Sequence, residues 1–364
     1  MIRLAKPSLR TFVPSFILRP FSSSSRHCLL RPRAPFMQVQ APYRPPLRPL
    51  STATTPPAVP FRTHIGPLPS STSQSLTPNA HVFWHSPTST WTYVVVCPTT
   101  KKCVIIDPAL DYDPTSQKIT TESADALLAF IAEQGYEVEK ILESHAHADH
   151  LTSARYLKMK LGGNVENGVG EKITQTQEYF AKKYEIDVEE LEGSFDKLWK
   201  DGEKFEMGEC ECEIMHLPGH TADHVGYKFG SFCFVGDSVF LPTVGSARAD
   251  FPFGSPSTLF ASSQRLFSLP STTRLFSGHH YPSADESNVC SATVQEQKEM
   301  NRHLREGMDE AEFVKMRMER DSGLDEPRLL HQSLQVNIRG GRIPRGKDGT
   351  PYLRIPVKSV PEGL

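Results

Sequence analysis

The sequence predicts an α/β protein that carries its functional residues at the ends of strands. Strand-like apolar runs alternate along the chain with segments whose apolar residues have helical spacing. Histidine and aspartate residues directly follow several of the expected strands. A hydrophobic fraction of 38% is sufficient to bury a sizeable core. These observations favour a layered core of sheets and helices with its chemistry on the connecting loops.

The expected elements follow this alternation along the chain. Residues 122–134 have helical spacing and are followed by Gly135, which suits the end of a helix. Residues 164–200 show no clear pattern, and we expect them to form a surface excursion. Strands are expected at 91–96, 103–106, 140–144, 212–216, 224–229, 231–235 and 274–277, and helices at 152–161, 257–269 and within 291–320.

The N-terminal region differs from the rest of the chain in charge. Residues 1–50 contain nine basic residues, and no Asp or Glu occurs before Asp107. An Arg-rich, Ser-rich start without acids is typical of a mitochondrial presequence, which predicts a protein of the mitochondrial matrix. The alternative is a Pro-rich tail without a targeting role. After it we expect a disordered linker at 51–78, a core domain at 79–290, and a C-terminal helical segment and tail at 291–364.

Composition argues against several partners and sites. The net charge of −2 gives no reason to expect binding to nucleic acid. No stretch approaches the ~20 apolar residues of a membrane helix, so membrane insertion is not expected. Of seven cysteines, Cys28 lies in the predicted presequence, and we expect the others to be small buried residues. Cys210 and Cys212 form a C-x-C pair, but no second pair completes a zinc site.

The segment from His145 to His150 holds a cluster of metal-binding residue types. It reads His-Ala-His-Ala-Asp-His, follows an expected strand and precedes an expected helix. Imidazole nitrogen and carboxylate oxygen are ligands that divalent transition metals favour. Three histidines and an aspartate this close together predict a metal site.

Three further residues stand in similar positions. His220 lies in Leu-Pro-Gly-His-Thr, Asp237 in Val-Gly-Asp-Ser, and His279 in Ser-Gly-His-His-Tyr, each shortly after an expected strand. Each alone is a weak signal, because an aspartate after glycine is commonly a turn residue. Their shared placement at strand ends makes them candidate ligands.

Together these residues resemble the metallo-β-lactamase superfamily. The H-x-H-x-D-H motif of that family matches His145, His147, Asp149 and His150, and its later ligands match His220, Asp237 and His279. The resemblance implies a four-layer αβ/βα sandwich, in which two sheets face each other with helices outside. It also implies a metal site along one edge of the sandwich.

A finer resemblance, over residues 79–345, is to the glyoxalase II-related persulfide dioxygenases. It is carried by residues 236–251, by Ala-Thr-Val-Gln-Glu-Gln at 292–297, and by Gln-Val-Asn-Ile-Arg at 335–339. In that branch one Fe(II) per chain is held by residues that match His145, His220 and Asp237, which makes these three the expected catalytic residues. Two histidines and a carboxylate are the ligand set of many non-haem iron oxygenases. The resemblance then leaves four residues to orient ligands or to hold a second metal, namely His147, Asp149, His150 and His279.

The resemblance also implies a substrate. The family reaction oxidises glutathione persulfide with O₂ and water to sulfite and glutathione. Arg248 and Tyr281 match family residues near the substrate. The alternatives are an ion pair between Arg248 and Asp250, and ordinary packing for Tyr281. His280 departs from the family, which commonly has aspartate there, so any role that needs a carboxylate at this position is in doubt.

Other functions stay open on the sequence alone. A glyoxalase II-like hydroxyacylglutathione (thioester) hydrolase would use all seven ligands to hold two ions of Zn, Fe or Mn. A non-catalytic metal-binding scaffold would be expected to lack one or more ligands, and none is missing. A nuclease would need a large insert and a basic surface, and neither is visible. The resemblance leaves a homodimer open.

Overall fold

Two β-sheets form the centre of the protein. The computed structural model describes residues 62–65, 76–281 and 289–361. In these ranges a seven-stranded sheet has the order β1-β2-β3-β4-β7-β9-β10, and a six-stranded sheet runs in sequence order from β11 to β16. The first sheet comprises β1 (Arg62–Ile65), β2 (Asn79–His85), β3 (Thr90–Val96), β4 (Lys102–Ile106), β7 (Glu137–Leu142), β9 (Glu166–Gly170) and β10 (Lys197–Trp199). The second comprises β11 (Lys204–Met207), β12 (Cys210–His216), β13 (Val225–Phe229), β14 (Phe232–Gly236), β15 (Arg274–Ser277) and β16 (Ser291–Thr293).

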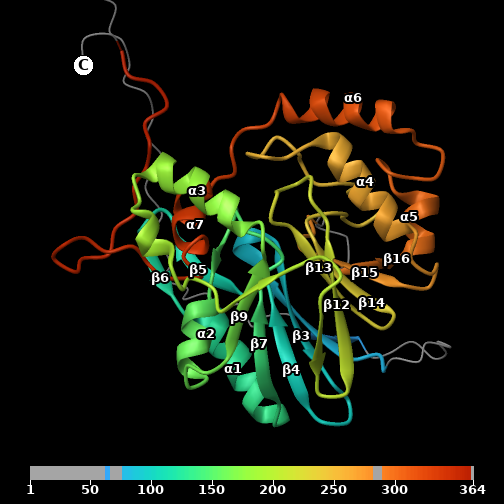
Figure 1. Ribbon diagram of the computed structural model, residues 1–364, viewed down its shortest axis with the longest axis horizontal. Helices are drawn as coiled ribbons and strands as arrows, with labels where there is room; N and C mark the ends of the chain where they lie inside the picture. Colours follow the sequence, from blue (N-terminus) through green and yellow to red (C-terminus); the bar gives the residue numbers. More distant parts are fainter. Residues whose placement is uncertain (1–61, 66–75, 282–288, 362–364) are drawn as a thin grey trace, which may run out of the picture. The chain divides into compact units, whose positions relative to one another are not determined.

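Helices cover the outer faces of both sheets. Helices α1 (Glu122–Gln134) and α2 (Ala154–Lys160) pack on the first sheet, and α4 (Pro256–Phe267) and α6 (Glu310–Asp321) contribute to the apolar cluster of the second (Figure 1). This arrangement confirms the predicted four-layer sandwich. The remaining described elements are η1 (Ser86–Thr88), β5 (Ala109–Asp113), β6 (Lys118–Thr120), β8 (Leu151–Thr152), α3 (Ile173–Tyr184), η2 (Val188–Leu191), α5 (Val294–Met300) and α7 (Leu330–Asn337).

The alternation of side chains in β3 explains how the layers hold together. Trp91, Tyr93 and Val95 point into the core between the two sheets, whereas Val94 and Val96 pack against the first helical layer. Successive side chains of a strand point to opposite faces, so a strand buried on both faces is apolar throughout. All seven residues of β3 are buried, which anchors the sheet from which the first ligand loops emerge.

The expectation of a surface excursion at 164–200 is wrong. The segment supplies β9 and β10, which are paired in parallel in the first sheet, with α3 between them. Strand β9 reads Glu-Asn-Gly-Val-Gly, so it lacks the apolar pattern of a strand, in part because of Gly168. A Cβ atom there would lie 2.4 Å from the indole nitrogen of Trp199, so close packing requires glycine.

Two described strands can be compared with the expected domain boundaries. Strand β1, paired antiparallel with β2, falls inside the expected linker at 51–78. Strand β16 begins at Ser291, one residue beyond the expected end of the core. The expected presequence at 1–50 lies outside the described residues. No described helix is long and apolar enough to cross a membrane.

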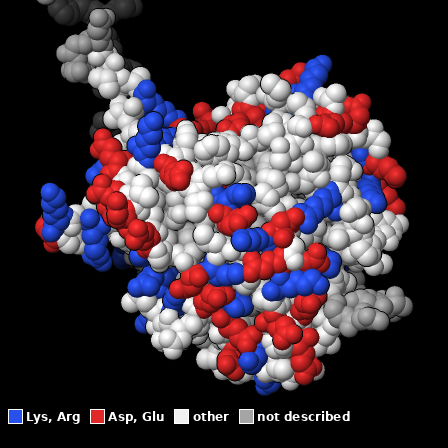
Figure 2. All heavy atoms as spheres, viewed as in Figure 1, with Lys and Arg blue, Asp and Glu red and all other residues white. Residues whose placement is uncertain are grey.

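Surface charge is mixed on the face shown in Figure 2, where Lys and Arg are interspersed with Asp and Glu. The six cysteines among the described residues are all free and buried, which confirms the expectation for them.

Candidate metal centre

Loops from both sheets bring the candidate ligands together. The loop from His145 to His150 follows β7 of the first sheet, whereas His220, Asp237 and His279 follow β12, β14 and β15 of the second. Strands β14 and β15 are parallel, so their carboxyl ends meet at one edge of the sheet. The structure therefore unites all seven residues that the sequence placed at strand ends.

The carboxylate of Asp237 lies at the centre of this group. Its Oδ2 atom is 4.0 Å from Nε2 of His145, 3.8 Å from Nε2 of His220 and 3.5 Å from Nε2 of His279. Two atoms that bind one metal ion at ~2 Å lie at most ~4 Å apart. Oδ2 of Asp237 meets this condition with both His145 and His220. The donor atoms of all three residues lie within 4.8 Å of one another, and each of the three residues is buried.

A second group of donors lies beside the first. His147, Asp149 and His150 offer donor atoms within 4.8 Å of one another. The rings of His145 and His147 are 4.1 Å apart, and Nε2 of His279 is 3.2 Å from Oδ2 of Asp149. The two groups therefore form one continuous cluster of imidazoles and carboxylates.

The cluster contains several buried polar atoms that have no hydrogen-bond partner among the described residues. They include Nε2 of His145, Nδ1 of His147, Nε2 of His150 and Oδ1 of Asp237. Buried polar atoms are nearly always paired, because an unpaired one retains the cost of losing water. A metal ion could bind several of these unpaired nitrogen and oxygen atoms at once, so their position in one cluster fits a metal site.

Two other histidines of the cluster, His220 and His279, are held by the surrounding chain through their Nδ1 atoms. Nδ1 of His220 is 2.8 Å from the carbonyl oxygen of Arg248, and Nδ1 of His279 is 2.9 Å from the carbonyl oxygen of Ser89. Because a carbonyl oxygen only accepts, Nδ1 must donate in each pair. Nε2 of the neutral ring then keeps its lone pair for a metal ion.

Asp107 supports the cluster through its contacts with Ser144 and His147, and it was not among the site residues predicted from the sequence. Its Oδ1 atom accepts the N–H of Ser144 at 2.6 Å and lies 3.1 Å from Nε2 of His147. Burial acts to raise the pKa of the Asp107 carboxyl, but the charge and hydrogen bond of His147 outweigh burial and lower this pKa. Burial acts to lower the pKa of His147, but Asp107 and Glu143 outweigh it and raise that pKa well above its usual value.

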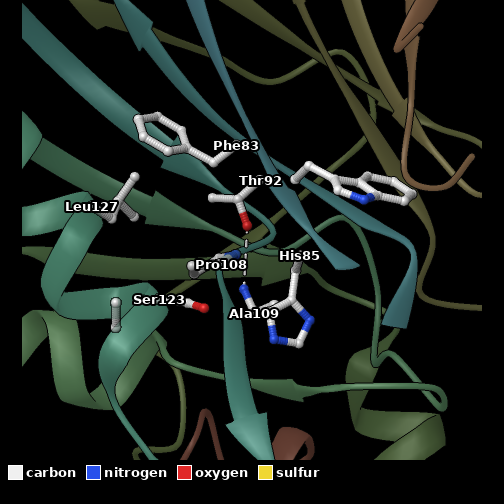
Figure 3. A pocket seen from close by; sticks show the side chains of 9 residues that line it. Phe83, His85, Thr92, Pro108, Ala109, Ser123 and Leu127 are labelled. Atoms are coloured by element: carbon white, nitrogen blue, oxygen red, sulfur yellow. Dashed lines mark hydrogen bonds between the residues drawn. The ribbon is translucent and has the colours of Figure 1, made fainter. Parts of the chain in front are cut away.

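The backbone of Asp107 has an unusual conformation that the first sheet stabilises. Its φ angle is +51°, a value that residues other than glycine rarely adopt. Thr92 donates a hydrogen bond to the carbonyl oxygen of Asp107 at 2.8 Å and accepts one from the N–H of Ala109 at 3.3 Å. Figure 3 shows the second of these bonds at the wall of a small pocket of about 20 Å³. Thr92 thus holds the turn that aims the Asp107 carboxylate at His147.

The loop of His220 depends on Gly219, which precedes it. The φ angle of Gly219 is +131°, and a Cβ atom there would lie 2.3 Å from the backbone nitrogen of Leu259 in α4. Only glycine fits both the conformation and the space. Gly219 therefore allows the loop to bring His220 to the end of the second sheet.

Two other supporting residues were missed as site residues. His224 accepts the N–H of Asp237 at 3.0 Å through its Nε2 atom and stacks on His145. Asn337 of α7 donates to the carbonyl oxygens of His147 and His150, at 2.7 and 2.8 Å. Asn337 stands in the segment 335–339 that carried part of the family resemblance, and that resemblance was the available signal.

A cavity of about 530 Å³ opens beside the cluster, lined in part by Asp149, His220, Asp237 and His279. Tyr281 also lines it, with its ring parallel to that of His279 at 6.0 Å.

The other predicted substrate residue, Arg248, reaches the same cavity but has protein partners. Its Nε and Nη2 atoms each donate to the carboxylate of Asp250 at 2.6 Å, and Nη1 donates to the carbonyl oxygen of Asp325 at 2.8 Å. The alternative foreseen for this side chain, an ion pair with Asp250, is present in the structure.

Fold and site together define a member of a known superfamily. Residues 85–279 match the Metallo-beta-lactamase superfamily, and the chain belongs to it. Over 286 residues it is 42% identical to a beta-lactamase hydrolase-like protein of Xylella fastidiosa, an alignment that covers 78% of this chain. The chain spans 66% of that relative's length.

Two further comparisons support the assignment. The chain is 39% identical over 280 residues to glyoxylase B2 of Dictyostelium discoideum, covering 76% of this chain and 96% of the relative. The solved structure of ETHE1 from Myxococcus xanthus has the same fold, with a TM-score of 0.58 and 24% identity. The match covers 72% of this chain and 99% of that one.

Proposed function

We propose that this protein is a mononuclear non-haem iron dioxygenase that oxidises glutathione persulfide with O₂ and water to sulfite and glutathione. The observation that carries the proposal is the buried group of His145, His220 and Asp237. Two of its members, His220 and Asp237, line the large cavity, the one of about 530 Å³ described above. Two histidines and one carboxylate leave coordination positions open for substrate and O₂. The resemblance of residues 236–251, 292–297 and 335–339 to persulfide dioxygenases supports the same choice.

The chain would contribute positioning and shielding to this reaction. His145, His220 and Asp237 would hold Fe(II), which supplies the redox chemistry when it is bound. The hydrogen bonds from His220 to Arg248 and from His279 to Ser89 fix the ring orientations. Phe240 and Phe251 line the cavity beside these histidines and exclude water from part of it.

A hydroxyacylglutathione hydrolase is the alternative, and one observation favours it. His147, Asp149 and His150 form a second group of donors, and His279 lies within 3.5 Å of both Asp149 and Asp237. These residues could hold a second ion of Zn, Fe or Mn, so that two ions activate one hydroxide.

Activity and metal content of the same preparation test the choice. Protein purified without oxygen would be analysed for metals and then assayed for O₂ uptake with glutathione persulfide and for hydrolysis of S-lactoylglutathione. The dioxygenase proposal expects about one iron per chain, O₂ uptake and little hydrolysis. A count near two with thioester turnover and no O₂ uptake would establish the hydrolase instead.

We also propose that the protein acts in the mitochondrial matrix. The support is the acid-free, Arg-rich composition of residues 1–50. Fractionation and N-terminal sequencing of the mature protein would test it. Recovery from the cytosol with Met1 or Ile2 at the N-terminus would contradict the proposal.

A further inference from the structure

Four arginines line the large cavity, and two of them are neutralised by neighbouring acids. Arg248 is paired with Asp250, and Arg317 of α6 is paired with Asp321. Neither aspartate lines the cavity. Guanidinium groups held in this way have few donors left for a ligand.

The other two arginines, Arg320 and Arg328, have no ion-pair partner among the described residues. The side chain of Arg320, at the end of α6, makes no hydrogen bond there either. Arg328, in the connection to α7, has a single long contact, 3.4 Å from its Nη2 atom to the carbonyl oxygen of Pro87. Both side chains are exposed and reach the cavity. They are therefore the cations of the cavity that remain available to a ligand.

The surroundings increase the effect of these charges. Val244, Leu324 and Pro327 contribute apolar surface to the cavity, and a charge beside an apolar wall is less screened than one in open water. His303, which also lines the cavity, adds no positive charge of its own. Burial, together with the charges of Arg317 and Arg320, lowers the pKa of His303 to about 4, so this ring is neutral at pH 7.

We propose that Arg320 and Arg328 form a binding site for the carboxylates of a small anionic substrate whose sulfur end reaches the metal cluster. Arg320 and Arg328 line the same cavity as Asp237 and His279, so a single ligand can contact the two arginines and the metal cluster. Guanidinium binds carboxylate through two parallel hydrogen bonds, which suits a peptide thiol with free carboxylates. The site deepens the proposed function and rests on it only for the identity of the reacting group.

In this proposal the side chain of Arg248 does not bind the substrate. For Arg248 to bind a substrate carboxylate, it would have to leave the two 2.6 Å hydrogen bonds to Asp250. Arg320 and Arg328 lose no ion pair when they bind a ligand.

Direct binding of glutathione to the metal-loaded protein tests the proposal without reference to the reaction. Isothermal titration calorimetry would compare wild type with Arg320→Ala, Arg328→Ala, the double variant and the control Arg305→Ala. Arg305 is exposed and does not line the cavity. Each cavity variant is expected to bind about tenfold more weakly, the usual effect of losing a hydrogen bond to a charged group. The control should bind as wild type does, and Arg320→Lys should retain part of the affinity.

Activity with a neutral substrate separates this proposal from the proposed function. Wild type should favour glutathione persulfide over N-acetylcysteamine persulfide, which has no carboxylate. The double variant, Arg320→Ala with Arg328→Ala, should lose this preference because its KM for glutathione persulfide rises. If the protein hydrolyses thioesters instead, the S-lactoyl derivatives of the same two thiols give the same comparison. Unchanged glutathione binding in the double variant, or a larger loss in Arg248→Ala than in either cavity variant, would overturn the proposal whichever reaction the enzyme catalyses.

Discussion

Nδ1 of His220 lies 2.8 Å from the backbone carbonyl oxygen of Arg248, whose side chain is paired with Asp250. One residue thus serves the site through its main chain, while its guanidinium stabilises a neighbouring loop. A substitution at position 248 changes only the second of these contributions, because every residue has a backbone carbonyl group.

Arg248→Ala should therefore keep the metal and lose a little stability. The pair with Asp250 is partly exposed, and such pairs contribute ~0–1 kcal/mol to the free energy of unfolding. Metal analysis and thermal unfolding of the variant check this expectation. Loss of the metal from Arg248→Ala would show that the side chain is needed to place the carbonyl group that orients His220.

His220→Ala and His279→Ala should differ in metal content. In the one-iron hypothesis His220 is a ligand, so its removal leaves two protein ligands and should abolish both iron binding and activity. His279 supports Asp149 and Asp237 from outside that set, and its removal should reduce metal affinity or activity only ~10–100-fold.

Metal counts on wild type and the two variants decide between the hypotheses. A wild-type count near two that falls to one in His279→Ala would mean that His279 binds a second ion. That result would favour the thioester hydrolase.

Asp107→Asn should weaken metal binding although Asp107 is outside the proposed ligand set. The change removes the negative charge 3.1 Å from Nε2 of His147 and can reorient that ring. An affinity loss of ~10–100-fold is typical for such supporting residues, and competition with a chelator would measure it. Asp113→Asn is a matched control, because the carboxylate of Asp113 is exposed and bonds within its own turn to Thr115 and Ser116. Equal affinities for both variants would contradict the supporting role of Asp107.

Cys97 should titrate near neutral pH, unlike the other cysteines in the part of the chain that the structure describes. Burial acts to raise the pKa of its thiol, but hydrogen bonds from Thr100, Thr99 and the N–H of Glu209 outweigh burial and lower this pKa to about 6. Burial instead raises the pKa of Cys103 and of Cys233 to about 12. Thiolate absorbance of wild type minus that of Cys97→Ser should therefore show one transition near pH 6.

The lowered pKa of Cys97 also determines how the free energy of unfolding changes with pH. Because the folded pKa of Cys97 lies below the unfolded value of 9.0, the thiolate favours the folded state at high pH. The free energy of unfolding of wild type relative to Cys97→Ser should rise from about pH 6 to about pH 9 and be lost as pH falls through 6. A difference that does not change with pH would contradict the lowered pKa.

Some parts of the site were visible in the sequence and others were not. His145 to His150 could be recognised because four donors adjoin in sequence, and His220, Asp237 and His279 because each follows a strand. Asp107 directly follows β4 and Asn337 ends α7, and only the folded chain brings these distant residues to His147. The role of β9 was hidden for a related reason, since Gly168 is set by the indole of Trp199 rather than by any local pattern.

The division of the ligands between the two sheets has a consequence for when the metal is acquired. His145 to His150 follow β7 of the first sheet, whereas His220 and Asp237 follow β12 and β14 of the second. In an unfolded chain these segments are far apart, so they hold an ion weakly. If the protein crosses a membrane unfolded, as the proposed presequence implies, it should arrive without metal. It would then take its ion from the pool of the compartment where it folds, so the supply on the far side of that membrane would decide which ion it carries.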